Sequence, residues 1–313
     1  MTAARPAPAR AGAGTLYILL AAAGFSAVST LTSIALAQRV SLASVLLWRY
    51  ALAAAVMAAF IARRRYPRLP PSDAALWIVV GGGGEALLVG LALSSLPYID
   101  VATLAFLFYT YPSWVTLVQA VRGAEALSTR RLVALVLSFA GVVVIAGRPL
   151  GGRAAWQGIV LALGAAAVYG AYIPAVQRMQ KTFSVAVTTA HAKLGAAACF
   201  LVVGLGQHSL AASLPRTAWL AILALTVFST VLPGVFFLMG LVRLGPVRAA
   251  IVSTVEPFLT AVLGAAVLRQ RITAGMLLGG CLIAAAVLIL RARREGGGGA
   301  GTGWNEEVHN RQS

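Results

Sequence analysis

Acidic residues and cysteines are scarce in this chain, which has eight aspartates and glutamates and two cysteines in 313 residues. Cys199 and Cys281 both lie inside apolar runs, with no CxxC motif and no metal-ligand spacing, so they are interpreted as packing residues. The three histidines form no HExxH motif, and there is no GxSxG motif or aspartate pair. We therefore expect no metal site, no cofactor and no enzymatic activity; an intramembrane enzyme is the alternative, which a hydrolysis or group-transfer assay would detect.

Charge is also scarce, at 11% of residues, whereas soluble domains average about 25%. Apolar residues make up 60% of the chain and the mean hydropathy is +0.87. A soluble fold of this length could not cover so much apolar surface, but lipid can. A membrane-spanning helix needs roughly 20 apolar residues. The pattern therefore predicts an all-α membrane protein with ten transmembrane helices, at 15–36, 41–62, 75–95, 99–121, 129–147, 155–176, 184–205, 217–240, 247–268 and 272–290.

The two ends of the chain are predicted to lie outside these spans. Arg5 and Arg10 precede the first apolar run, as in a signal peptide, but the run is longer than the roughly 7–15 residues of a cleavable one. We interpret it as an uncleaved first helix after a tail at 1–14, with cleavage as the alternative. The segment 291–313, which includes GGGG, is predicted to be a disordered tail.

The formal net charge of +17 is explained by membrane topology. If the N-terminus is cytoplasmic, the cytoplasmic segments hold 17 arginines and lysines and the opposite side holds 6. Positively charged loops favour the cytoplasm, so both termini are predicted to be cytoplasmic. The basic residues form short clusters between apolar runs and no basic face of a soluble domain, so nucleic-acid binding is not expected.

Two landmarks recur at almost the same offset along the chain. Pro112 and Pro257 are 145 residues apart, and Arg49 and Lys193 are 144 apart. The offset predicts two units of five helices, 15–147 and 155–290. Because five is odd, the second unit must enter the membrane from the opposite side, which is the inverted repeat of many secondary transporters. Chance alignment of low-complexity apolar sequence is the alternative.

The order of several motifs resembles the EamA-type members of the drug/metabolite transporter superfamily. The motifs are LLWRYALAA around Arg49, ATLAFLFYTYPSWVTLV around Pro112, GAEALSTRRLVALVLSFAGVVVIAG, and VRAAIVSTVEPFLTAVLGAAVL. The family's loop carboxylate is matched by Glu125 in the first half, but Gln270 stands at the equivalent place in the second. This departure weakens a coupling role for the loop carboxylate.

The resemblance implies a multi-pass protein of the bacterial inner membrane that exports small metabolites, with amino acids as the first expectation. It also implies a central cavity among spans 1–4 and 6–9. A multidrug transporter and a sugar-phosphate or nucleotide-sugar exchanger remain alternatives within the fold, and a channel or a non-transporting scaffold remains one outside it. The expected partners are a small-molecule substrate and membrane lipid, with proton coupling as an option and a monomer or a homodimer as the assembly.

Two carboxylates at membrane depth are the first candidates for the substrate site, because charges there usually face a wet interior. Glu256 precedes Pro257, whose missing N–H breaks the helix and frees a carbonyl beside the carboxylate. It is predicted to hold a substrate ammonium or exchange a proton, or alternatively to pair with Arg49 or Lys193. Glu85 follows the glycines at 81–84, which permit close approach of a backbone or ligand, and it either lines the cavity or has a structural partner.

Three cationic or titratable side chains complete the charged set. Arg49 is assigned to gating or a structural ion pair, and Lys193 to the substrate site, where an amine can titrate. His191 lies two residues from Lys193 on a different helix face, and either titrates as a gating residue or packs by hydrogen bonding.

Aromatic side chains with polar tips suit a cavity wall, and Tyr109, Tyr111 and Tyr169 are assigned to the substrate site, with ordinary packing as the alternative. Tyr111 aligns with Glu256 across the repeat, so the two are expected to face each other. Helix breaks are predicted at Pro112, Pro257 and Pro233.

Overall fold

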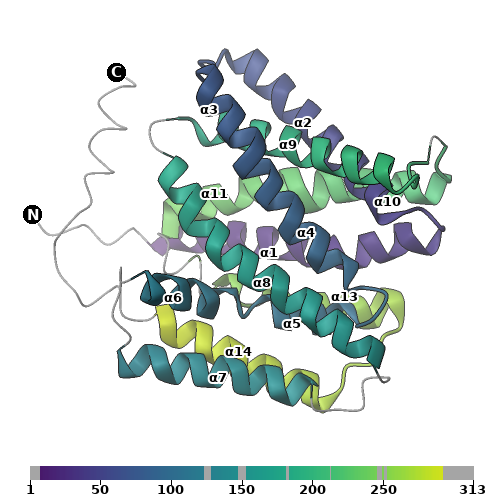
Figure 1. Cartoon of the computed structure of the whole chain (residues 1–313). Helices are drawn as coiled ribbons and strands as arrows, with labels where there is room; N and C mark the ends of the chain where they lie inside the picture. The colour runs from purple at the N-terminus through teal and green to yellow at the C-terminus, as the bar shows by residue number, and fades with distance from the viewer. Residues whose placement is uncertain are drawn as a thin grey trace, which may run out of the picture.

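The structure of the protein, a computed structural model, describes residues 8–122, 128–146, 153–180, 183–211, 213–244, 249 and 252–291. Within these ranges every regular element is a helix (Figure 1). Glu125 and the tail after residue 291 lie outside the described residues. The all-α class predicted from composition is therefore confirmed for the part of the chain that the structure covers.

The helices of the first half are α1 (Pro8–Ala37), α2 (Leu42–Arg64), α3 (Pro71–Leu76), η1 (Trp77–Gly82), α4 (Gly83–Ser94), α5 (Val101–Phe108), α6 (Tyr111–Val121) and α7 (Thr129–Ala146). Those of the second half are α8 (Arg153–Met179), α9 (Val185–Gly206), α10 (Arg216–Thr226), η2 (Val227–Val231), α11 (Leu232–Leu244), α13 (Glu256–Leu268) and α14 (Ala274–Arg291). The elements η1 and η2 are π-helical.

Eight helical stretches of the described residues are long and apolar enough to cross a membrane, and two shorter apolar helices follow them at Glu256–Leu268 and Ala274–Leu290. Large apolar side chains also cover the outside of the bundle; Val79, Val136 and Val202 are each more than 60% exposed. Such a surface would be anomalous on a soluble monomer. A multi-pass membrane protein is therefore confirmed.

Three of the expected spans differ in form from simple continuous helices. The first helix begins at Pro8, before the expected start at residue 15, because proline fits the first turn and the alanines after it favour helix. The third and eighth spans each contain a π-helical segment, η1 and η2, which the residue pattern does not reveal. In an α-helix such segments are rare and often mark functional sites.

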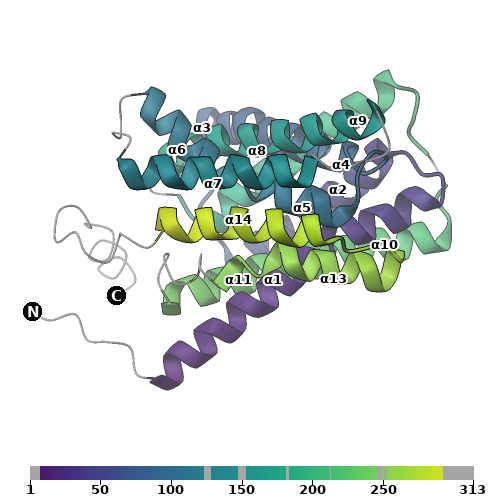
Figure 2. The same ribbon diagram turned by 90° about the horizontal axis from the view of Figure 1, so that it is seen from below.

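The helices pair as two related halves would. Three contacts join a helix to its equivalent in the other half: α2 with α9, α5 with α13 and α7 with α14. The contact of α1 with α11 has its counterpart in the contact of α8 with α4, because α8 is the equivalent of α1 and α4 that of α11. Figures 1 and 2 both show α7 and α14 side by side at one edge of the bundle, with the start of α1 and the end of α14 on the same side. The central position of α5 and α13 brings the two predicted breaks together.

Two glycines allow η1 to approach α9 closely. A Cβ on Gly82 would lie 2.5 Å from the Cα of Gly195, and a Cβ on Gly195 would lie 2.0 Å from the carbonyl oxygen of Ile78. Neither backbone could give way to a methyl group without moving its helix. This contact sets how near Glu85, one turn further on, comes to α9.

Gln270, where the resemblance leads one to expect an acid, contacts the start of α5. Its side-chain oxygen accepts a hydrogen bond from the N–H of Val101 at 3.1 Å. Asp100, the N-cap residue of α5, makes no capping hydrogen bond with its own side chain. Gln270 therefore supplies one of the acceptors that the first turn of a helix needs.

Replacing Gln270 with alanine is expected to destabilise the protein by about 1 kcal/mol, because a helix-capping hydrogen bond is lost. Gln270→Glu is expected to keep the stability, since a carboxylate accepts the same bond and is favoured at a helix N-terminus. The midpoint of thermal unfolding in detergent tests both variants. Equal destabilisation by alanine and glutamate would contradict the capping role.

Candidate functional site

The break before α13 places a carboxylate beside a free carbonyl. Pro257 lacks the N–H that would bond to the carbonyl of Ser253, four residues earlier. The hydroxyl of Tyr109 occupies that position instead, 2.9 Å from the Ser253 oxygen and 2.8 Å from Oε2 of Glu256. The two broken spans are thus joined by one side chain, with Tyr109 at the end of α5 and Glu256 at the start of α13.

A row of aromatic rings continues from Tyr109 into the second half of the chain. The ring centroids of Tyr109 and Tyr111 are 5.9 Å apart, those of Tyr111 and Tyr169 are 4.8 Å apart, and those of Tyr169 and Tyr172 are 6.4 Å apart. Phe108 stacks on Tyr169 at 5.4 Å. At the helix break between α5 and α6, Phe108 and Tyr111 contact Tyr169 of α8, while Tyr109 bonds to the start of α13.

The row ends at the glycine run of η1 and α4. The hydroxyl of Tyr172 donates a hydrogen bond to the carbonyl of Gly81 at 2.9 Å. A Cβ on Gly84 would lie 2.5 Å from the Tyr172 ring, so only glycine leaves room for it. The next residue, Glu85, therefore lies beside the end of the aromatic row.

Glu85 is the acceptor of a second polar cluster. Its Oε1 forms an ion pair with Nζ of Lys193 and accepts a hydrogen bond of 3.2 Å from the hydroxyl of Tyr50. Nζ of Lys193 also lies 5.3 Å from the centroid of the Tyr50 ring. The side chains of Lys193 and Glu85 are 16% and 17% exposed. This pair joins α4 of the first half to α9 of the second.

Arg49 extends the cluster to the π-helical segment η2. Its Nε donates a hydrogen bond of 3.1 Å to Oγ1 of Thr230, and its guanidinium lies 5.4 Å from the Tyr50 ring centroid. Arg49 is only 6% exposed, and its Nη1 has no hydrogen-bond partner among the described residues. A buried guanidinium nitrogen without a hydrogen-bond partner is costly, which makes Arg49 a candidate contact for an anionic group.

The structure thus gathers most of the residues selected from the sequence into two adjoining clusters. Glu256, Tyr109, Tyr111 and Tyr169 form one, and Glu85 and Lys193 form the other, with Arg49 behind it. The ion pair considered between Glu256 and Arg49 or Lys193 is not formed, since Lys193 pairs with Glu85. Pro112 and Pro257 lie in the first turns of α6 and α13.

His191 and Pro233 lie apart from these clusters. Nδ1 of His191 is 2.7 Å from the carbonyl oxygen of Val187, and the side chain lines a groove between α2 and α9. Pro233, in the first turn of α11, packs against Gly24, where a Cβ would lie 2.3 Å from its ring.

Residue-pattern reasoning missed Tyr50 and Thr230. Tyr50 contacts both Glu85 and the two cations, and its position next to Arg49 in LLWRYALAA was the available indication. Thr230 is recognised only once η2 is known, because the π-helical turn lets its hydroxyl bond to the Leu225 carbonyl five residues earlier while accepting from Arg49. Among the described residues, no group of three or more histidine, cysteine or acidic side chains is placed to hold a metal ion.

Comparison with known proteins identifies the two halves. The model of the EamA-like transporter family matches residues 12–147 and again 156–292. The starts of the two matches are 144 residues apart and the ends 145, which equals the offsets of the paired landmarks. A solved crystal structure has a TM-score of 0.62 at 20% identity and covers 91% of this chain and 99% of its own. No curated protein matches the chain.

Proposed function

This chain belongs to the EamA-like transporter family, and we propose that it exports small metabolites, above all amino acids, as a secondary transporter of the bacterial inner membrane. The family is one of transporters, so carriage of a solute across a membrane follows from membership. The substrate class, the direction and the membrane are the proposed part.

The proposed topology has ten crossings, with cytoplasmic termini and the second five helices inverted relative to the first. The symmetric helix pairing supports it, as do the start of α1 and the end of α14 on one side of the bundle. The break before Pro257 starts α13 at Glu256, which is why α13 alone is too short to be counted as a span. The excess of arginines and lysines in the segments on the side of the two termini supports a cytoplasmic location for that side.

The observation that carries the substrate class is the interior arrangement of opposite charges. Glu256 accepts a hydrogen bond from a tyrosine and faces no cation among the described residues, so it can hold a substrate ammonium. Arg49 has a buried nitrogen with no hydrogen-bond partner in the part of the chain that the structure describes, and this nitrogen can bind a carboxylate. An amino acid carries both groups, and the aromatic row between the clusters offers an apolar surface to its side chain.

Tyr109 suggests how a proton could be coupled to the cycle. Its single hydroxyl hydrogen lies within reach of two acceptors, Glu256 and the Ser253 carbonyl. When Glu256 is ionised, Tyr109 donates to the carboxylate; when Glu256 is protonated, the acid donates to Tyr109, which then donates to Ser253. Protonation thus changes the contact between the two broken spans, about which the halves would alternate.

Counterflow in proteoliposomes tests the proposed function. Liposomes with the purified protein, loaded with unlabelled amino acids, are expected to accumulate labelled amino acid several-fold above protein-free liposomes. Amino-acid amides, which lack the carboxylate, and N-acetyl amino acids, which lack the ammonium, are expected to compete at least about tenfold less well, since each leaves one charged group unpaired.

Two results would contradict this assignment. Equal competition by the amides and the N-acetyl derivatives would exclude zwitterion recognition. Counterflow of drugs, sugar phosphates or nucleotide sugars without counterflow of any amino acid would show that the protein is a transporter of another substrate class. Unitary currents in a planar bilayer would indicate a channel.

A further inference from the structure

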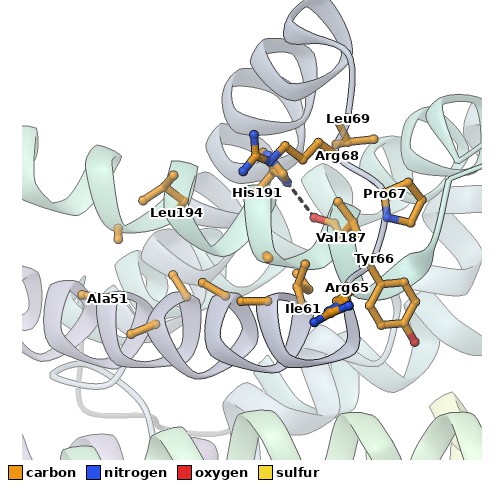
Figure 3. A pocket seen from close by; sticks show the side chains of 16 residues that line it. Ala51, Ile61, Arg65, Tyr66, Pro67, Arg68, Leu69, Val187, His191 and Leu194 are labelled. Carbon is orange, nitrogen blue, oxygen red and sulfur yellow. Dashed lines mark hydrogen bonds between the residues drawn. The ribbon is translucent and has the colours of Figure 1, made fainter.

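A groove on the outside of the bundle lies between α2 and α9 and is lined by side chains other than those of the clusters described above, although Ala51 follows Tyr50 and Leu194 follows Lys193 in the chain. It has a volume of about 900 Å³ (Figure 3). One wall is formed by alanines of α2 from Ala51 to Ala62, and the other by residues of α9 from Val187 to Ala197. Leu194, which lines the groove, is 52% exposed, so the groove opens to the surroundings of the bundle and not into its core.

The two ends of the groove differ in chemistry. Figure 3 shows Ala51 at one end and Arg65 and Tyr66 at the other, with Arg68 and His191 also in the lining. Arg65 and Arg68 are exposed, and neither side chain has an ion pair or a hydrogen bond to any described residue. No described acidic residue lines the groove. The lining is therefore cationic at one end and apolar along the rest.

The groove is long enough to hold one lipid acyl chain. Ala51 and Arg65 are separated by 14 residues of helix and its cap, or about 21 Å at ~1.5 Å per residue. One leaflet of hydrocarbon is about 15 Å thick, half of a core of ~30 Å. A phosphate at the arginine end would thus place an acyl chain along the alanines with its terminus near the middle of the membrane.

We infer that this groove binds one anionic phospholipid, with its phosphate between Arg65 and Arg68 and one acyl chain against the alanines of α2. Basic residues at the membrane surface attract anionic headgroups, and basic pockets between helices bind individual lipid headgroups. A free phosphate would leave the apolar length of the groove unfilled, and a zwitterionic lipid would bring a cation to the arginines. This inference needs only the membrane location of the chain and not its substrate.

Lipid titration of the purified full-length chain, followed by thermal unfolding in zwitterionic detergent, tests the site. Phosphatidylglycerol is expected to raise the unfolding midpoint in a saturable way. Phosphatidylcholine with the same acyl chains, glycerol phosphate and inorganic phosphate are each expected to need at least about tenfold higher concentration for the same shift. A saturable shift with either soluble phosphate at the concentration of the lipid would overturn the inference, as would equal shifts with the two lipids.

Matched variants separate the groove from general surface charge. Arg65→Gln with Arg68→Gln is expected to weaken phosphatidylglycerol at least about tenfold, whereas Arg63→Gln with Arg64→Gln, an equal charge change outside the lining, is expected to leave it within about twofold. Equal weakening by the two pairs would overturn the inference.

A second pair of variants tests the apolar wall of the groove, and it tests the lipid site even if the arginine variants fail to fold. Ala55 lines the groove and Ala59 does not, and both are exposed on α2. Ala55→Phe fills the groove and is expected to weaken phosphatidylglycerol at least about tenfold, while Ala59→Phe is expected to have no effect beyond about twofold. Unchanged lipid binding in Ala55→Phe would overturn the placement of the chain. Loss of binding with unchanged counterflow supports the lipid site; counterflow substrate competing with the lipid would assign the groove to the substrate instead.

Discussion

Glu256→Gln is expected to lower the rate of amino-acid counterflow by about tenfold to a hundredfold, the loss that follows when one charge-assisted hydrogen bond to the substrate is removed. Glutamine keeps the size of the side chain and an oxygen that can accept from Tyr109, 2.8 Å from the present carboxylate. The break before α13 should therefore survive, because Pro257 and not Glu256 causes it. The measurement is initial counterflow rate at equal protein content.

Asp73→Asn supplies the matched control, since it removes one negative charge in the first turn of α3, away from both clusters. Its rate should stay within about twofold of the unmodified protein, as expected for a surface substitution. Tyr109→Phe should fall between the two variants, because it keeps the carboxylate but removes the hydroxyl that holds it. Full activity in Glu256→Gln would remove this residue from the substrate site.

Lys193→Met is expected to cause the largest loss of stability, about 3 kcal/mol, because it leaves the carboxylate of Glu85 largely buried without its cation. The midpoint of thermal unfolding in detergent should fall by roughly 5 °C. The double variant Lys193→Met with Glu85→Gln should recover most of the loss, since no unpaired charge remains and Tyr50 can still donate to the amide oxygen.

Arg216→Met is the control for this second experiment, because it removes one basic charge from the exposed start of α10. Little change in its unfolding midpoint is expected. If the double variant is no more stable than Lys193→Met alone, the ion pair is not what stabilises this contact, and Lys193 acts through its position over the Tyr50 ring.

The breaks in the fourth and ninth spans were predictable because their cause is local. A proline has no N–H wherever it lies, so Pro257 frees the carbonyl of Ser253 whatever else surrounds it. The partner of that carbonyl was not predictable, since Tyr109 lies 144 residues away in the chain. The repeat offset pointed to the neighbouring Tyr111 as the residue facing Glu256, whereas the hydrogen bond comes from Tyr109.

The ion pairing shows the same division between local and tertiary causes. The cost of charge in lipid makes Arg49, Glu85 and Lys193 candidates from their positions alone. Their pairing depends on how closely η1 and α9 approach, which Gly82 and Gly195 permit. Gln270 also shows the limit of pattern reasoning, because the residue that departs from the family pattern caps α5.

The sequence alone determined that this is an all-helical membrane protein of two related halves, because hydropathy, arginine placement and a repeated proline act through solvent and local backbone chemistry. The family match to both halves confirms that organisation. Only the tertiary structure decided which charges meet, where π-helical turns place Thr230 and Gly81, and that α2 and α9 leave a groove with arginines at one end. These features depend on distances between helices far apart in the chain, and packing of whole side-chain surfaces sets those distances.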